Sequence, residues 1–261
     1  MKNIKSQIQN ATEGFLTELG DITLFTIRTI QQFFVAPFEY RELLKQGYQI
    51  GNKTLSLISI TGFIMGLVLT LQSRPVLVEF GAQSMLPGMI TVSIIREIGP
   101  VITALLCAGK ISSGIGAELG AMKVTEQLDA MEVSGTKPLN FVVATRVLAT
   151  TLMVPVLVFF SDAVAIFGSY VAVIMHEKMS FFLFLSQAFD SLSFTDVIPA
   201  TVKTIFFGFF IGLIGSYRGY NTKRGTESVG LSANSAVVTA SLVIFIIDLV
   251  AVQVSLLIYS I

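Results

Sequence analysis

Long apolar segments alternate with short polar stretches over most of the chain, and this pattern predicts a bundle of membrane-spanning helices. The clearest segment, residues 54–73, holds no charged side chain between Lys53 and Arg74. Its 20 residues would form about 30 Å of helix, which matches the hydrocarbon core of a bilayer. We expect five spans, at about residues 54–73, 85–109, 138–175, 197–217 and 228–261. Five crossings place the two ends of the chain on opposite sides of the membrane.

The Lys and Arg residues between the spans predict how the chain is oriented. They gather in three places: ahead of the first span, between residues 110 and 137, and between residues 218 and 227. The two remaining connections hold only Arg74 and Lys178. Because short connections rich in Lys and Arg stay on the cytoplasmic side, we expect the N-terminus and the two basic connections there.

Paired glycines predict close packing between spans. Gly62 with Gly66 in the first span, and Gly208 with Gly212 in the fourth, have the spacing that lets two helix backbones approach in lipid. We therefore expect a compact bundle, although this motif indicates no particular function.

The first 52 residues have a different pattern from the spans. Apolar positions recur there at helical spacing among charged and amide side chains; they are Phe15, Leu16, Leu19, Ile22, Ile27, Ile30, Phe33 and Phe34. Such a stripe is typical of an amphipathic helix that lies in the membrane interface. A helix packed on the chain's own bundle would show the same stripe, so both interpretations stay open. We divide the chain into this segment, residues 1–52, and a transmembrane domain, residues 53–261.

Composition narrows the class of protein further. Hydrophobic residues make up 53% of the chain and charged residues only 13%, about half the charged share of a soluble domain. The 17 Lys and Arg balance the 17 Asp and Glu, which argues against a nucleic-acid partner. A single cysteine, Cys107, and a single histidine, His176, exclude a disulfide framework and a multi-histidine metal site. We find no nucleophile and base pair that would indicate a catalytic site.

Charged residues inside the predicted spans are the first candidates for function. Arg96 and Glu97 lie near the middle of the second span, and Lys203 lies in the fourth. A charge at the centre of a bilayer costs about 2.5 to 3.5 kcal/mol, so it usually faces protein or water and often marks a pathway. We expect Lys203 to pair with Glu97, either on such a pathway or as a structural salt bridge. Asp162 and Asp248 are expected to cap or bridge helices.

The connection between the second and third spans is unusually rich in charge. Residues 117–133, AELGAMKVTEQLDAMEV, are good helix formers, and we expect one short helix after Gly114 and Gly116 loosen the chain. Gly135 and Pro138 would end it. Its charged residues are Glu118, Lys123, Glu126, Asp129 and Glu132. From composition alone, an ordinary solvated helix is the favoured interpretation.

Several runs in and around this connection resemble a known family. They are REIGPVITALL from residue 96, AGK at 108–110, the helical run described above, and PLNFVVATRVLA from residue 138. Together they resemble the MlaE/YrbE family of ABC-transporter permeases, most strongly over about residues 90–160. Residues 109–138 are most similar to the cyanobacterial and plastid-encoded branch, with Lys110 where the family commonly has Arg.

The resemblance implies a function, a set of partners and a location. Members of the family move lipids, are driven by a separate ABC ATPase, and work with lipid-binding proteins that carry an MCE domain. Their coupling helix docks into the ATPase, which here implies docking by Glu118, Lys123, Glu126, Gln127, Asp129 and Glu132. Glu97 would lie at a lipid cavity near the axis of a dimer. The chain would then sit in a bacterial inner membrane or in the inner envelope membrane of a plastid.

The expected fold class is an all-α integral membrane protein with five transmembrane helices, an N-terminal interfacial helix and a short cytoplasmic coupling helix. No Walker A sequence occurs, since Gly109 and Lys110 are followed by Ile111. We therefore expect no cofactor in this chain and no enzymatic activity of its own, with ATP bound by the partner ATPase. Because such ATPases act as dimers and five spans make a small wall, we expect a homodimer.

Two other functions remain open at the level of the sequence. One is a proton-coupled secondary transporter, in which Glu97, Lys203 and Asp248 would relay protons. The absence of an obvious inverted repeat argues against it. The other is a membrane anchor for an ATPase complex that transports nothing, although an anchor has no need of charges inside its spans.

Overall fold

The computed structural model describes residues 2–33 and 39–259, and side chains for residues 16–33 and 39–258. All regular structure in these residues is helical, and five helical stretches are long and apolar enough to cross a membrane. The expected all-α integral membrane protein with five spans is therefore confirmed. The spans are α2 (Tyr40–Glu79), the stretch Gln83–Val124, the stretch Leu139–Ile174, α9 (Phe194–Tyr220) and α10 (Thr226–Tyr259).

The second and third spans are built from several pieces. The second joins η1 (Gln83–Met85), α3 (Leu86–Ser93), α4 (Gly99–Cys107) and α5 (Ser113–Val124) through the π-helical segments η2 (Ile94–Ile98) and η3 (Ala108–Ser112). The third joins the π-helical η4 (Leu139–Ala144) to α7 (Thr145–Ile174). Outside the spans lie α1 (Lys2–Gln32), α6 (Gln127–Val133) and α8 (Phe181–Asp190).

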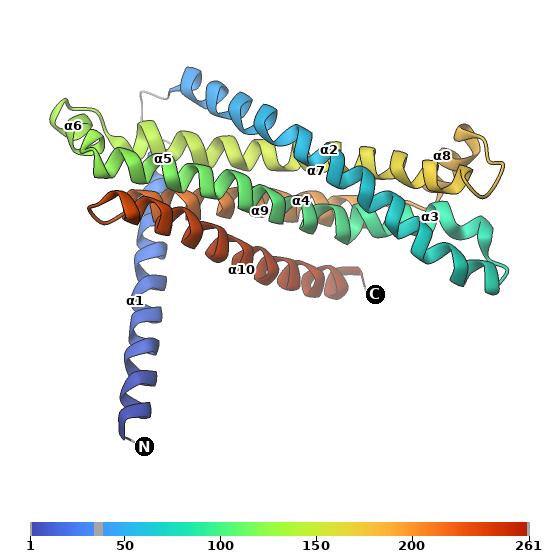
Figure 1. The fold of residues 1–261 in the computed structure, drawn as a ribbon, viewed down its shortest axis with the longest axis horizontal. Helices are drawn as coiled ribbons and strands as arrows, with labels where there is room; N and C mark the ends of the chain where they lie inside the picture. The colour runs from blue at the N-terminus through green and yellow to red at the C-terminus, as the bar shows by residue number, and fades with distance from the viewer. Residues whose placement is uncertain (1, 34–38, 260–261) are drawn as a thin grey trace.

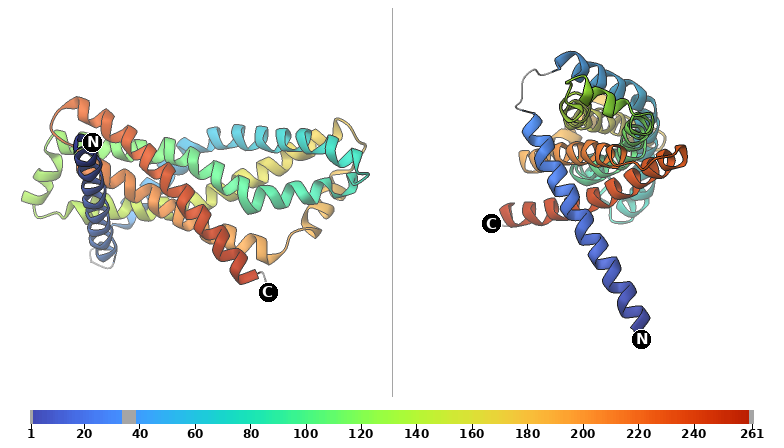
Figure 2. Two further views of the ribbon diagram at one scale, coloured as in Figure 1. Left: turned by 90° about the horizontal axis from the view of Figure 1, so that it is seen from below. Right: turned by 90° about the vertical axis from the view of Figure 1, so that its left-hand side faces the viewer.

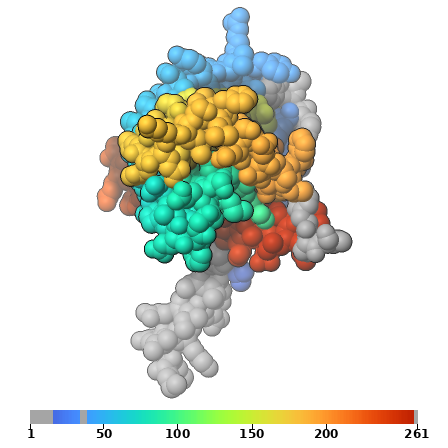
Figure 3. Space-filling view, turned by 90° about the vertical axis from the view of Figure 1, so that its right-hand side faces the viewer, coloured from blue at the N-terminus to red at the C-terminus, as the bar shows by residue number. Residues whose placement is uncertain are grey.

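The spans run along one common axis, which gives the bundle two distinct ends (Figures 1 and 2). One end holds α6, α1 and the connection between α9 and α10. The other end holds α8, the start of α3 and the described end of α10 (Figure 3). The two basic connections thus share one end, as the sequence predicts. That this end faces the cytoplasm stays a prediction.

The core of the bundle is α7, which packs against both α2 and α9. Of the spans, α7 has the most buried apolar stretch and α10 the least. A Cβ on Gly66 would lie 1.8 Å from the backbone oxygen of Ala165, and a Cβ on Gly208 would lie 2.5 Å from that of Thr150. Only glycine allows these backbones so close together, so the compact packing predicted from the glycine pairs is confirmed.

The N-terminal helix α1 crosses one end of the bundle at a steep angle (Figure 1). Its Phe25 is buried and packs on Tyr217 and Tyr220 of α9, with ring centroids 5.5 and 5.9 Å away. Glu18 of α1 forms an ion pair with Arg218 at the end of α9. The second half of α1 is therefore attached to the bundle, as one of the two interpretations predicts.

The same helix keeps an apolar surface that the bundle does not cover. The exposed residues are Leu16, Leu19, Leu24, Ile27 and Ile30. A helix that lies across the end of the spans with such a surface fits the membrane interface. The two interpretations therefore combine, because one side of α1 packs on the bundle and another is free for lipid. Phe15 and Phe34 lie outside the residues whose side chains the structure describes.

The expected short helix at residues 117–133 is wrong in its extent. The second span continues without interruption through Gly114 and Gly116 to Val124, and the chain turns only at Thr125 and Glu126. The reason is that Gly116 does not loosen the helix but brings it against α10, where a Cβ would lie 3.3 Å from that of Ala236. The separate helix is the shorter α6, which begins at Gln127 and is followed by Gly135 with a φ of 82°.

Candidate functional site

Three charged residues from three spans meet inside the bundle. Lys203 of α9 is only 4% exposed, and its Nζ donates to Glu97 Oε2 at 2.6 Å and to Asp248 Oδ1 at 2.9 Å. Glu97 comes from η2 and Asp248 from α10. We call these residues the Lys203 triad. The predicted pairing of Glu97 with Lys203 and the predicted bridging role of Asp248 are both confirmed.

The local sequence explains why Glu97 lies in a π-helical segment. Pro100, just after η2, has no backbone N–H, and in a regular α-helix its ring would crowd the carbonyl of Arg96. The wider π-helical turn at Ile94–Ile98 accommodates this break without ending the span. Such segments frequently occur at functional sites because they shift side chains out of the regular helical register.

A second ion pair lies beside the triad. Arg96 Nη1 is 3.7 Å from Asp196 Oδ1, and the Arg96 side chain is 48% exposed. Asp196 also closes the start of α9, since its Oδ2 accepts from the backbone N–H of Ser193 at 3.1 Å and from the Ser193 hydroxyl at 2.7 Å. Among the side chains that the structure describes, one long contact holds Arg96, whereas the hydrogen bonds to Ser193 fix Asp196.

Asp196 is not among the candidates from the sequence, although a signal for it exists. Ser193 and Asp196 form a capping box, which is readable as S-x-x-D before an apolar run. Asp196 precedes Lys203 by two helical turns, so the two side chains project from the same side of α9. Arg96, Asp196 and the Lys203 triad together form the charged site. It contains two cations and three carboxylates, which gives a formal net charge of −1.

An apolar groove begins at these charges. It runs between α9 and α10, has a volume of about 460 Å³ and shares Lys203 with the triad. The groove continues from a narrower cleft that contains Arg96, Glu97 and Asp196. Its walls include exposed apolar side chains, among them Val202, Phe206, Ile246, Val250 and Val254. The site therefore combines a cluster of charged side chains with a longer apolar wall.

Asp162 does not take part in this arrangement. It is 5% exposed on α7, makes no ion pair within residues 16–33 and 39–258, and its Oδ1 has no hydrogen-bond partner there. The carboxylate lies against Gly99, where a Cβ would be 1.8 Å from Oδ1. The predicted cap or bridge from Asp162 is therefore not seen among the described side chains.

The charged connection between the second and third spans forms a projecting corner. Glu126 adopts a left-handed conformation, with a φ of 59°, where the chain turns from α5 into α6. Lys123 on α5 reaches across this turn to Asp129 on α6, with Nζ 2.8 Å from Oδ1. Leu128 is 1% exposed and anchors α6 to the bundle. We call α6 with this turn the α6 corner.

The predicted docking residues do not all lie on the α6 corner. Glu126, Gln127, Asp129 and Glu132 are exposed there, and Glu132 accepts a hydrogen bond of 3.3 Å from the Tyr220 hydroxyl. Glu118 instead lies on α5, where its Oε1 accepts from buried Arg146 at 2.8 Å. The structure thus separates Glu118 from the acidic face that the sequence groups it with.

Comparison with known proteins places the chain in context. The sequence model of the family described as Permease MlaE matches residues 43–254. A probable ABC transporter permease of Rickettsia typhi is 34% identical over 244 residues, 94% of each chain. The intermembrane phospholipid transport system permease MlaE of Haemophilus influenzae is 34% identical over 209 residues, 80% of each chain. A probable ABC transporter permease of Pyropia yezoensis is 34% identical over 209 residues, 80% of this chain and 79% of its own.

Proposed function

The chain belongs to the MlaE family of ABC-transporter permeases, and from this premise we propose that it moves phospholipids, driven by a separate ATPase subunit. The printed name of the Haemophilus influenzae relative describes a permease of intermembrane phospholipid transport. The chain itself is a multi-pass membrane protein with five spans. We propose that its membrane is a bacterial inner membrane or the inner envelope membrane of a plastid.

The observation that carries this proposal is a charged cluster that adjoins an apolar groove. A phospholipid has a phosphate at one end and long acyl chains at the other, which is the polarity of this site. Arg96 is half exposed and held by one 3.7 Å contact, so its guanidinium can turn to a phosphate and bind it with two parallel hydrogen bonds. The acyl chains would lie along α9 and α10, among the apolar side chains of the groove.

The Lys203 triad supplies a site whose charge balance can change. Lys203 is shared by two carboxylates, so a lipid phosphate that approached Lys203 would have to displace one of them. Glu97 is the more exposed of the two, with 39% of its side chain accessible against 21% for Asp248. We infer that Glu97 is the carboxylate that moves, while Asp248 keeps Lys203 in place.

The α6 corner supports the proposed ATPase partner. Its acidic residues are exposed at the end of the bundle where the basic connections lie, and Val133 at the end of α6 is 91% exposed. An exposed apolar side chain beside a cluster of like charges fits a protein partner that is matched to it by charge. In this proposal ATP is bound by that partner, and this chain couples to it through Glu126, Gln127 and Asp129.

A second copy of the chain completes the proposed permease. Only 6% of the most apolar part of α10 is buried, against 67% for α7, so α10 packs on its neighbours but leaves most of its apolar surface uncovered by the described chain. In a homodimer formed around this surface, the grooves of the two copies would meet and form one enclosed pathway. We further propose an MCE-domain lipid-binding protein at the end opposite α6, which would exchange the lipid with this pathway.

Co-purification from the native membrane tests these proposals together. The tagged chain, extracted in a mild detergent, is expected to carry a second, differently tagged copy, an ABC ATPase, an MCE-domain protein and phospholipid enriched over a control membrane protein from the same preparation. Protein mass spectrometry and lipid extraction are the measurements. Recovery of the chain without an ATPase would contradict the proposed transporter, and recovery without enriched phospholipid would contradict the proposed substrate.

A further inference from the structure

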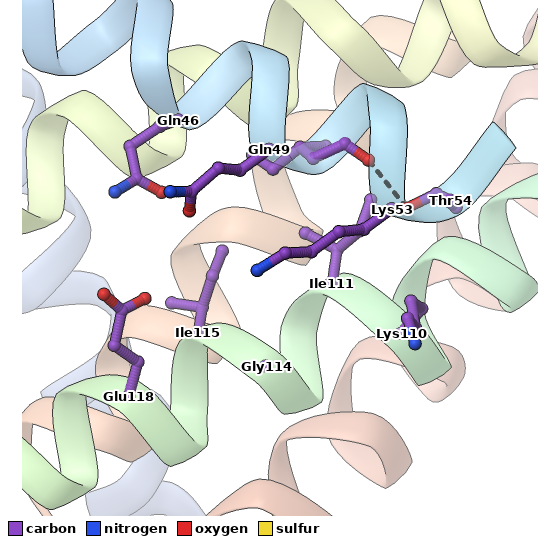
Figure 4. A pocket seen from close by; sticks show the side chains of 10 residues that line it. Gln46, Gln49, Lys53, Thr54, Lys110, Ile111, Gly114, Ile115 and Glu118 are labelled. Carbon is purple, nitrogen blue, oxygen red and sulfur yellow. Dashed lines mark hydrogen bonds between the residues drawn. The ribbon is translucent and has the colours of Figure 1, made fainter.

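A second polar cleft lies at the opposite end of the bundle from the Lys203 triad, between α2 and the second span. It has a volume of about 120 Å³, and its polar lining includes Gln46, Gln49, Lys53, Lys110 and Glu118. Figure 4 shows Lys53 reaching from α2 into the space between the two helices, with Gln46 and Gln49 beside it and Glu118 on the facing wall. We call this the Lys53 cleft.

The cleft has more positive charge than its own residues neutralise. Neither Lys53 nor Lys110 makes an ion pair in the part of the chain that the structure describes. The one carboxylate in the lining, Glu118, is bound to Arg146, which is 4% exposed. Two lysines thus line a space that also offers the amide group of Gln49, whereas the Gln46 amide nitrogen already donates to Glu42 Oε1 at 2.7 Å. Such a lining suits an anion with several acceptor oxygens.

The position of the cleft along the helices indicates which anion. Lys53 directly precedes the uncharged run of the first span, so its Nζ lies at the depth of lipid headgroups. Leu57, Ile60 and Ile64 continue from Lys53 along the same side of α2, and all three are exposed. A lipid with its headgroup in the cleft would therefore lay its acyl chains on an apolar surface that is already in place.

Lys110 gives a second, independent indication. It lies in the π-helical segment η3 (Ala108–Ser112), one of the two such segments in the second span. The other, η2, carries Arg96 and Glu97 of the charged site described above. Segments of this kind frequently occur at functional sites. In η3 the charged side chain is Lys110, which lines the cleft from the second span.

The geometry points to a binding site for the phosphate headgroup of an anionic phospholipid, drawn from the leaflet nearest α6. Lys53 binds the phosphate, Gln49 donates to one of its oxygens, and Lys110 adds positive charge at the edge of the cleft. Basic pockets between transmembrane helices commonly hold anionic headgroups in this way. The site lies apart from the Lys203 triad and its groove, so the proposal concerns a lipid bound beside the permease and holds whether or not the chain transports phospholipid.

The chain contains no tryptophan, which allows a direct test. Leu57→Trp places one fluorophore a helical turn beyond Lys53, and Leu152→Trp places one on an exposed position of α7 as a control. The full chain is reconstituted in phosphatidylcholine vesicles that contain either brominated phosphatidylglycerol or brominated phosphatidylcholine. We expect brominated phosphatidylglycerol to bind beside Leu57→Trp about fivefold more tightly than brominated phosphatidylcholine, and beside Leu152→Trp with no preference.

Substitutions within the Leu57→Trp background show whether the cleft is responsible. Lys53→Gln with Lys110→Gln is expected to remove the preference, whereas Lys45→Gln, on the same helix but outside the cleft, should leave it unchanged. A preference that survives the double substitution, or equal quenching by both lipids beforehand, would overturn the proposal. Displacement of the brominated lipid by inorganic phosphate at constant ionic strength would also overturn it, because the site would then bind the free anion.

Discussion

Lys203→Ala is expected to abolish lipid transport and to destabilise the bundle by about 3 kcal/mol. The substitution removes the cation from between two carboxylates, Glu97 and Asp248, which both lie within 3 Å of it. Glu97 and Asp248 would then repel one another across the space that Lys203 fills. That space is almost wholly shielded from solvent. We place the cost at the lower end of the range for broken buried ion pairs because the Glu97 side chain is 39% exposed. Thermal unfolding in detergent measures this loss.

Substitution of Glu97 separates a transport role from a structural one. Glu97→Ala leaves the pair between Lys203 and Asp248 intact, so it should cost little stability. If Glu97 is the carboxylate that yields to a lipid headgroup, transport should nevertheless fall at least about tenfold, which corresponds to a loss of about 1.4 kcal/mol in the transport barrier. Normal transport by folded Glu97→Ala would contradict the role on the pathway.

The double variant provides the matched comparison. Glu97→Ala combined with Lys203→Ala removes one of the two repelling carboxylates, so we expect it to be more stable than Lys203→Ala alone and still inactive. Lys178→Ala, an exposed lysine outside the spans, should change neither property. A structural salt bridge alone would predict that the double variant recovers transport along with stability.

Reversal of charge on the α6 corner is expected to have the second large effect, which is loss of the ATPase. Glu126→Lys with Asp129→Lys replaces two exposed acidic side chains with basic ones and sets Lys123 against a lysine in place of its partner. A complementary partner surface would then meet like charges, which costs several kcal/mol at an interface. The measurement is the amount of ATPase that co-purifies with the inserted chain.

Two controls keep this result interpretable. Glu126→Gln with Asp129→Asn removes the charges without reversing them, and we expect it to weaken the association only in part. Asp190→Lys, on α8 at the far end of the bundle, should have no effect. If the charge-reversed chain binds the ATPase as before, the α6 corner is not the docking surface, and the interpretation of an ordinary solvated helix holds.

The spans were predictable because each depends on composition within one segment. A run such as residues 54–73 must be helical in lipid whatever surrounds it, and the structure places it within the longer α2. The pairing of Glu97 with Lys203 was predictable for a similar reason, since charges inside spans need a partner. The sequence groups Asp248 with these two residues only in the proton-relay alternative, because its direct pairing with Lys203 depends on which faces of α9 and α10 meet.

The errors arose where a residue type has two physical uses. Gly114 and Gly116 were interpreted as points where the helix loosens, but a glycine also permits close packing, and Gly116 lies against α10. Nothing in the local sequence distinguishes the two uses. Glu118 was grouped with the acidic face for the same reason, because its partner Arg146 is 28 residues away on another span. Asp196 was missed although its capping box could be read from the sequence.

Reconstituted transport tests the central claim most directly, because it separates an ATP-driven permease from a proton-coupled carrier that would use the same triad. The complex of this chain with its ATPase is placed in vesicles with a fluorescent phospholipid, and transfer of the lipid is followed with ATP and Mg²⁺, with a non-hydrolysable analogue, or with an imposed pH gradient. We predict transfer that requires ATP hydrolysis and does not respond to the pH gradient. Transfer driven by the pH gradient without ATP would contradict the account.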